Sequence, residues 1–177
     1  MTRLALLAAV AALTASPALA ALKEGAVAPD FTLQGFQAGK PLTFSLADAR
    51  KKGPVVVYFF PAADTPGCNI EAKMFADATD QFKAQGATVI GVTAGNLDKL
   101  QKISSDTDKC SGKFPVAADP GAKVAKEYDA TLPAGISSRT SYVISPQGQV
   151  LHVHSEMNPN AHVSETLGAV KAWKAKK

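Results

Sequence analysis

The sequence has few cysteines and lacks a paired cysteine motif. Its 177 residues include only two, Cys68 and Cys110. No Cys-x-x-Cys is present, which argues against a redox enzyme of the dithiol type. An even pair of cysteines in an exported protein commonly forms a structural disulfide, so the count alone leaves that interpretation open for Cys68 and Cys110.

Long apolar runs and internal repeats are also missing. Residues 4–13 form a run of ten apolar residues, which is short of the roughly 20 that a membrane-spanning helix needs. We interpret residues 1–20 as a signal peptide, because Arg3 precedes this run and Ala18-Leu19-Ala20 has the small-x-small form of a cleavage site. We therefore expect an exported protein of the bacterial periplasm, without membrane attachment after cleavage. A retained anchor or a plain N-terminal helix is the alternative.

Neither sign of charge dominates the remaining residues 21–177. They carry 18 basic and 15 acidic side chains, a net charge of +3, and much of the excess lies in the last seven residues. No basic patch is interleaved with aromatic residues, so we do not predict nucleic-acid binding. These 157 residues are enough for one domain with its own core.

Hydrophobic patterning predicts alternating strands and helices. Residues 55–60 are continuously apolar, β-branched and aromatic, which is typical of a central strand covered on both faces. The other expected strands are residues 31–33, 42–45, 87–93, 114–117, 141–144 and 149–154, and the expected helices are residues 46–52, 71–84, 97–104, 121–128 and 162–173. This order predicts an α/β fold with a mixed central β-sheet flanked by helices. A thioredoxin-like layout has this order of elements, and so do other three-layer folds.

Cys68 follows the predicted central strand at a helix start. Thr65 is a favourable N-cap residue and Pro66 suits the first helical position. Cys68 then faces unpaired backbone N–H groups and the positive end of the helix dipole, which both favour a thiolate. A thiolate is the form of cysteine that attacks an O–O bond. A buried, inert thiol is the alternative interpretation.

Attack on a peroxide also requires donors that stabilise the leaving oxygen. The Thr65 hydroxyl lies three residues before the thiol. Arg139 is the best candidate for a cation, since Arg50 is the only other arginine beyond the leader. Arg139 precedes the strand expected at residues 141–144, whose end can lie beside the Cys68 loop. The alternative is a surface charge at a strand end.

These residues resemble the active-site motif of the peroxiredoxins. Pro61-x-x-x-Thr65-x-x-Cys68 matches that motif, and residues 58–72 are similar to the bacterioferritin comigratory protein branch, also called the Q type. Further blocks follow in the same order at residues 28–33, 114–119 and 139–144. The resemblance spans most of residues 26–144.

The resemblance implies a thioredoxin-like fold and the reduction of hydrogen peroxide or an organic hydroperoxide. Cys68 would be oxidised to a sulfenic acid. Pro61 would shield and shape the site, while Thr65 and Arg139 would orient the peroxide and stabilise the thiolate. The resemblance implies no metal or flavin cofactor, a thioredoxin-like or other thiol reductant as partner, and a monomer.

The chain departs from the family pattern at two places. Lys73 stands where many members of this branch have a resolving cysteine, and Ala62-Ala63 replace the family's Lys-Asp. We expect Cys110 to resolve the sulfenic acid as an intramolecular disulfide, after local unwinding of the helix start, because a bridge needs α-carbons within about 7 Å. A thioredoxin-like partner would then reduce it.

Three other interpretations remain open. In the first, Cys110 takes no part in the reaction. In the second, the chain is a non-catalytic thioredoxin-like domain with a structural Cys68–Cys110 disulfide. In the third, it is a peroxide sensor that oxidises a thiol of a partner protein.

Overall fold

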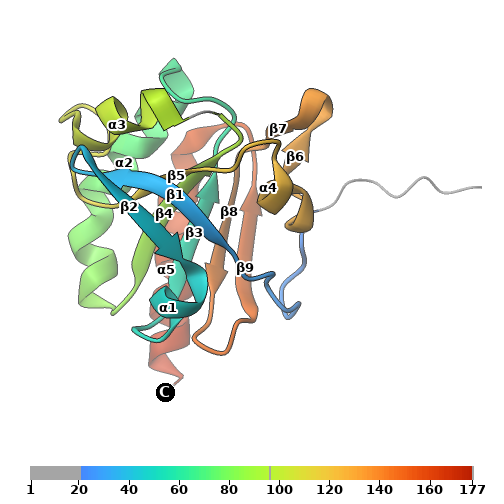
Figure 1. Cartoon of the computed structure of the whole chain (residues 1–177). Helices are drawn as coiled ribbons and strands as arrows, with labels where there is room; N and C mark the ends of the chain where they lie inside the picture. Colours follow the sequence, from blue (N-terminus) through green and yellow to red (C-terminus); the bar gives the residue numbers. More distant parts are fainter. Residues whose placement is uncertain (1–20, 96, 177) are drawn as a thin grey trace, which may run out of the picture.

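Seven strands form one mixed sheet at the centre of the molecule (Figure 1). The structure is a computed structural model that describes residues 21–95 and 97–176. The strands are β1 (Thr32–Gln37), β2 (Lys40–Ser45), β3 (Val55–Phe59), β4 (Thr88–Thr93), β5 (Val116–Ala118), β8 (Thr140–Ile144) and β9 (Val150–Ser155). Their order is β2-β1-β5-β4-β3-β8-β9. β3, β4 and β5 run parallel, and the other neighbours pair antiparallel.

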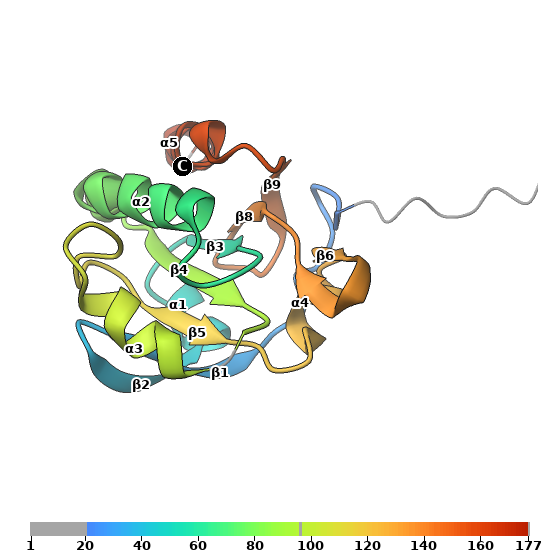
Figure 2. The same ribbon diagram turned by 90° about the horizontal axis from the view of Figure 1, so that it is seen from above.

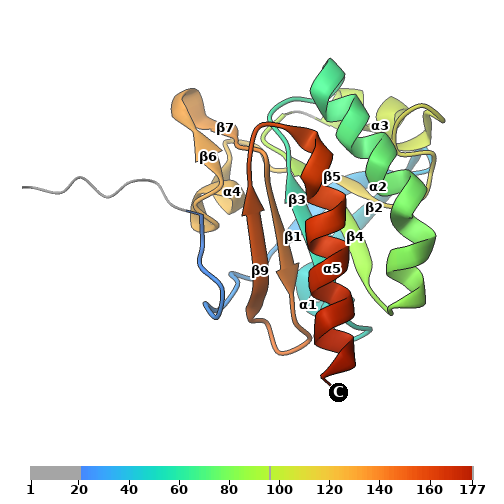
Figure 3. The ribbon, with the colours of Figure 1, turned by 180° about the vertical axis from the view of Figure 1, so that it is seen from behind.

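Helices cover both faces of this sheet. α2 (Pro66–Ala84) and α5 (His162–Ala175) lie side by side over one face (Figures 2 and 3), whereas α1 (Leu46–Arg50) and α4 (Lys123–Glu127) pack on the other. α3 (Leu97–Ser105) packs beside β1 and β5. The shorter elements are β6 (Thr131–Leu132), η1 (Pro133–Gly135), β7 (Ile136–Ser137) and η2 (Pro159–Ala161). The predicted α/β class with a mixed, helix-flanked sheet is confirmed.

β3 is central because both of its faces are apolar. All five of its residues are buried. Successive side chains of a strand point to opposite faces, so Val56 and Tyr58 join the apolar cluster under α2 and α5. Val55, Val57 and Phe59 join the cluster under α1 and α4. This double burial explains why the continuous apolar run predicted the strand correctly.

The β1–β2 hairpin is longer than the two short strands predicted there. Only Ala38 and Gly39 form its turn, with φ of 52° and 74°. Gly35 and Pro41 lie between the two strands predicted at residues 31–33 and 42–45, but they pair inside the observed strands. β5 passes so close to Gly35 that a Cβ there would lie 2.2 Å from the carbonyl oxygen of Val116. The glycine therefore permits strand contact and does not mark a turn.

The lead-in to the domain docks beside β9, where Val27 pairs with Gln149. The predicted signal peptide, residues 1–20, lies outside the described residues, so both the leader and a domain start at residue 21 stay predictions. None of the helices in the described ranges combines the length and apolarity that crossing a bilayer demands.

Candidate active site

Cys68 lies in the first turn of α2, just after the carboxyl end of β3. Pro66 is the first helical residue, as predicted, and the Asn69 N–H donates to the Thr65 carbonyl at 2.8 Å. The N–H groups of Gly67 and Cys68 precede this first helical hydrogen bond, so the helix leaves them free for a group beside the turn. The Cys68 side chain itself is only 5% exposed.

Thr65 holds the cap position, but its side chain does not cap the helix. Its backbone is extended, with φ −110° and ψ 152°, as expected of an N-cap residue. Its hydroxyl donates to the Ala62 carbonyl at 3.2 Å and accepts no bond from the helix. Thr65 therefore occupies the predicted cap position, while its hydroxyl turns back onto its own loop.

Arg139 precedes β8 and reaches Cys68 across the sheet. β8 pairs with β3, and Thr140 lies opposite Phe59, the last residue of β3. The guanidinium is buried, and its Nη2 donates to Cys68 Sγ at 3.5 Å. Its Nε donates to the Met157 carbonyl at 2.9 Å. The predicted proximity of Arg139 to the Cys68 loop is confirmed.

Gly67 leaves room for this guanidinium. A Cβ at position 67 would lie 3.1 Å from Arg139 Nη2, which is tighter than an ordinary van der Waals contact. A side chain at this position would require the guanidinium to move by a few tenths of an ångström.

Glu71 and His162 complete a buried network that the sequence analysis did not identify. Glu71 is fully buried and forms an ion pair with Arg139 through Oε2. Its Oε1 has no hydrogen-bond partner among the described residues and lies 3.6 Å from His162 Nδ1. His162 Nε2 faces the Glu156 carbonyl at 2.9 Å, and its Nδ1 faces the Ser141 hydroxyl at 2.8 Å. A carbonyl only accepts, so a neutral His162 carries its proton on Nε2 and Ser141 donates to Nδ1.

Burial shifts both titrating groups of this network toward their neutral forms. It raises the pKa of Glu71 to about 7, although the Arg139 charge opposes the shift. It also lowers the pKa of His162 to about 4. When Glu71 is protonated, less of the Arg139 charge is compensated and more of it acts on Cys68.

Helical spacing offers a signal for Glu71, which follows Cys68 by three positions on α2. The buried face of α2 consists of Cys68, Glu71, Ala72, Phe75, Ala76, Ala78, Thr79 and Phe82. Selecting apolar residues alone would include Ile70, which is 51% exposed. Counting i, i+3 and i+4 from the cysteine instead gives the observed face. His162 has no comparable signal, because it lies on a distant helix.

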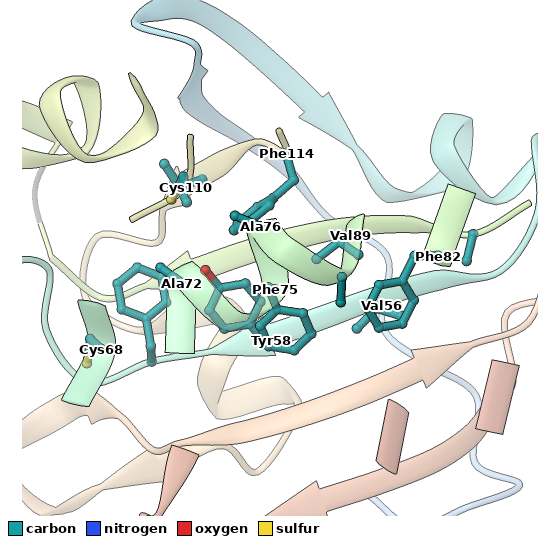
Figure 4. Packing of buried hydrophobic residues seen from close by; sticks show 14 of the residues in the cluster. Val56, Tyr58, Cys68, Ala72, Phe75, Ala76, Phe82, Val89, Cys110 and Phe114 are labelled. Carbon is teal, nitrogen blue, oxygen red and sulfur yellow. The ribbon is translucent and has the colours of Figure 1, made fainter. Parts of the chain in front are cut away.

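Cys110 shares a small cavity with Cys68, at the same end of the apolar cluster (Figure 4). Both cysteines are buried free thiols, and burial raises the pKa of Cys110 to about 12. Lys109 Nζ pairs at 2.7 Å with Asp64 of the loop before Cys68. The two cysteine-bearing segments are therefore linked by a partly buried ion pair.

Pro61 lies beside a separate, open pocket of about 370 Å³, which Ala62 and Ala63 also line. The structure thus brings Cys68, Arg139 and Cys110 together. Pro61 and Thr65 share the loop that leads to Cys68, but Pro61 faces the open pocket and the Thr65 hydroxyl faces its own loop.

A buried thiol at a helix start, facing a buried arginine on a mixed helix-flanked sheet, defines the class of thiol-based redox proteins with a thioredoxin-like fold. Within this class, the chain belongs to the AhpC/TSA family, because the sequence model of that family matches residues 25–153.

Curated relatives agree with this assignment. The chain is 35% identical over 149 residues to the chloroplastic peroxiredoxin Q of Oryza sativa subsp. japonica, covering 82% of this chain and 65% of the relative. It is 34% identical over 158 residues to the chloroplastic peroxiredoxin Q of Sedum lineare, and the match covers 88% of this chain and 81% of that relative. The chain therefore spans somewhat less than two thirds of the rice relative. These matches confirm the predicted resemblance to the Q-type peroxiredoxins.

Solved structures confirm the thioredoxin-like fold. The crystal structure of peroxidoxin BcpB from Mycobacterium tuberculosis matches with a TM-score of 0.74 and 30% identity, over 85% of this chain and 97% of that one. The reduced 2-Cys peroxiredoxin of Plasmodium vivax matches with a TM-score of 0.77, over 86% of this chain and 97% of that one. At 19% identity, the second match shows the fold alone.

The predicted periplasmic location is wrong. The relatives from Oryza sativa, Sedum lineare and Arabidopsis thaliana are chloroplastic proteins, and this finding contradicts the predicted bacterial periplasm. The prediction rested on a positive start, a short apolar run and small residues. These features describe the general form of a leader and do not specify its destination.

Proposed function

We propose that the protein is a thiol-dependent peroxidase that reduces hydrogen peroxide and organic hydroperoxides through Cys68. The observation that carries this proposal is the Arg139 guanidinium, buried and 3.5 Å from Cys68 Sγ at the start of α2. A structural disulfide would need two sulfurs and would gain nothing from an Arg139–Glu71 ion pair beside one of them. Membership of the AhpC/TSA family supports the same activity.

In the first step, the Cys68 thiolate attacks the terminal oxygen of the peroxide. A sulfur–oxygen bond forms, the O–O bond breaks, and Cys68 becomes a sulfenic acid. The other oxygen takes up a proton and leaves as water or an alcohol. Arg139 and the N–H groups of Gly67 and Cys68 stabilise the developing negative charge. Thr65 orients the peroxide and Pro61 shields the loop from solvent.

In the second step, the sulfenic acid of Cys68 condenses with the Cys110 thiol to a disulfide and water. The cavity that both cysteines line supports this pairing. Cys68 is held in a helical turn, so the start of α2 must unwind locally before the sulfurs reach bonding distance. A thioredoxin-like dithiol then reduces the disulfide by exchange. We propose a monomer as the working unit.

The test is hydrogen peroxide consumption by the reduced protein, followed by mass spectrometry of the product. We expect rapid consumption and a loss of two hydrogens that maps to Cys68 and Cys110. A Cys110→Ser variant should stop at the sulfenic acid, and Cys68→Ser should not react.

Two results would contradict parts of this proposal. Wild-type protein that retains Cys68 sulfenic acid beside a free Cys110 would overturn the resolving role and indicate an external thiol. Consumption no faster than that of Cys68→Ser would overturn the peroxidase activity itself.

A further inference from the structure

The cavity between the two cysteines has about the size of one water molecule. Its volume is about 10 Å³, at the lower limit of the roughly 10–15 Å³ that one water needs. Cys68, Cys110 and Tyr58 all line it. Condensation of a sulfenic acid with a thiol releases one water, and this cavity is the space that both cysteines share before the start of α2 unwinds.

Tyr58 of β3 carries a buried hydroxyl that packing does not explain. Its ring stacks on Phe75 at a centroid distance of 4.4 Å and meets Phe114 edge-on at 5.9 Å (Figure 4). A Cβ at Gly91 would lie 2.6 Å from the hydroxyl oxygen. Tyr58 is 1% exposed, and its oxygen has no hydrogen-bond partner among the residues that the structure describes. A phenylalanine would fill the same space without the cost of an unpaired buried hydroxyl.

Disulfide formation requires that a proton move from the Cys110 sulfur to the oxygen that leaves Cys68. The S–S bond forms while the S–O bond of Cys68 and the S–H bond of Cys110 break, and the thiol proton ends on the departing oxygen to give water. Burial raises the pKa of Cys110 to about 12, so Cys110 starts as a thiol. A thiol is a poor nucleophile until its proton is removed.

The nearby carboxylates are poorly suited to carry this proton. Asp64 also lines the cavity, but Lys109 pairs with it at 2.7 Å and holds its pKa below the usual range. Glu71 forms an ion pair with Arg139 and is not among the described residues that line the cavity. Tyr58 is the neutral group in the lining that can both donate and accept a hydrogen bond through one oxygen.

We propose that the Tyr58 hydroxyl is a catalytic proton relay for disulfide formation, accepting the proton of the Cys110 thiol while donating its own to the oxygen that leaves Cys68. The proposal rests on the resolving role of Cys110 proposed above. Tyr58 is neutral before and after the step, so no external acid or base is consumed. Burial raises the pKa of Tyr58 well above its ordinary value, which keeps the hydroxyl protonated and ready to donate.

The experiment compares wild-type protein with Tyr58→Phe after one equivalent of hydrogen peroxide. Rapid quenching and mass spectrometry follow the Cys68 sulfenic acid and the Cys68–Cys110 disulfide separately. We expect an unchanged rate of Cys68 oxidation and disulfide formation slowed about 100-fold, as is usual when a general acid–base group is lost. The wild-type rate of disulfide formation should fall in D₂O, and the Tyr58→Phe rate should lose much of this sensitivity.

Tyr128→Phe is the matched control. Its hydroxyl donates to the Pro29 carbonyl at 2.6 Å, and its ring belongs to the apolar cluster on the opposite face of the sheet. This variant should unfold at a lower temperature and form the disulfide at the wild-type rate. Tyr58→Phe, which loses no hydrogen bond within the described structure, should unfold at the wild-type temperature or above it.

The outcomes separate the two proposals. Disulfide formation in Tyr58→Phe at the wild-type rate, or with unchanged sensitivity to D₂O, overturns the relay and leaves the peroxidase proposal standing. A wild-type protein that consumes peroxide without forming the disulfide overturns both the resolving role of Cys110 and the relay.

Discussion

At the scale of single residues, Arg139 binds three partners at once. Its guanidinium pairs with Glu71 and donates to Cys68 Sγ and to the Met157 carbonyl. The planar fork of arginine can hold all three contacts, whereas the ammonium group of lysine is a compact point charge. The geometry of this side chain therefore matters as much as its charge.

Arg139→Lys should accordingly slow the reaction of Cys68 with hydrogen peroxide by about 100-fold, comparable to the loss of one donor from an oxyanion site. The charge remains in the substitution, but the fixed contact with the sulfur is lost. Stopped-flow measurement of the first oxidation step tests this. Arg50→Lys, on α1 and away from the site, should react like the wild type. If the Arg139→Lys protein reacted with hydrogen peroxide at the wild-type rate, the proposed role of the Arg139 guanidinium in the oxidation of Cys68 would be wrong.

Glu71 and His162 should have opposite effects on stability as the pH changes. The folded-state pKa of Glu71 is raised from 4.5 to about 7. The contribution of this group to the free energy of unfolding is therefore fully present below pH 4.5 and is lost as the pH rises through 7. The pKa of His162 is lowered from 6.5 to about 4, so its contribution is present above pH 6.5 and is lost as the pH falls through 4. Each shift corresponds to about 3 kcal/mol at most, and the two largely cancel between pH 4.5 and 6.5.

Glu71→Gln should remove this cancellation. We expect its free energy of unfolding, relative to the wild type, to increase by up to about 3 kcal/mol between pH 4.5 and 6.5, because only the His162 contribution remains. Urea unfolding at several pH values measures this. Glu127→Gln, an exposed substitution on α4, should show no such trend. A Glu71→Gln curve parallel to the wild-type curve would show that burial does not perturb this pair.

At the scale of elements, the first turn of α2 positions the thiol and also admits the arginine. Gly67→Ala should raise helix stability by up to about 1 kcal/mol. It should also slow peroxide reduction about tenfold, because its Cβ displaces the guanidinium that the proposed mechanism uses as a charge-stabilising donor. Thermal unfolding and initial rates, measured together, separate the two effects.

Gly168→Ala in α5 is the control, since a Cβ there would meet nothing within 4 Å. It should gain stability without any change in rate. If both variants gained stability and reacted equally fast, the space at Gly67 would have no catalytic importance.

The elements with a strong local pattern were predictable from the sequence. The apolar run of β3, the Thr65-Pro66 helix start and the β8–β9 hairpin all lie within a few residues of where the structure places them. β6 and β7 have two residues each, which is too short for any periodicity to develop. The β1–β2 turn was misplaced because Gly35 serves a contact with β5, which is distant in sequence.

At the scale of the whole molecule, local sequence and tertiary contacts contributed different parts of the site. The motif around Cys68 identified the thiol. The scarcity of arginines and the position of Arg139 before a predicted strand identified the cation. Glu71 had an unused signal in its helical spacing. The contacts of His162 arise from the packing of α5 on the sheet, and those of Tyr58 arise from the packing of α2 on β3. Spacing along the chain predicts neither set of contacts.

The apolar cluster that contains Cys68, Cys110, Tyr58 and Phe75 also supports the fold. In the proposed cycle, each closure of the Cys68–Cys110 disulfide loosens packing that the next reduction restores. Rates of unfolding rise about 3- to 6-fold per 10 °C. A local opening that equilibrates before the proton transfer should pass part of this temperature dependence to the resolving step, while the attack on peroxide changes less. Cooling should therefore shift the protein at steady state from the disulfide toward the sulfenic acid. Quantifying both forms at 5 °C and 35 °C would reveal whether the core sets the pace of the catalytic cycle.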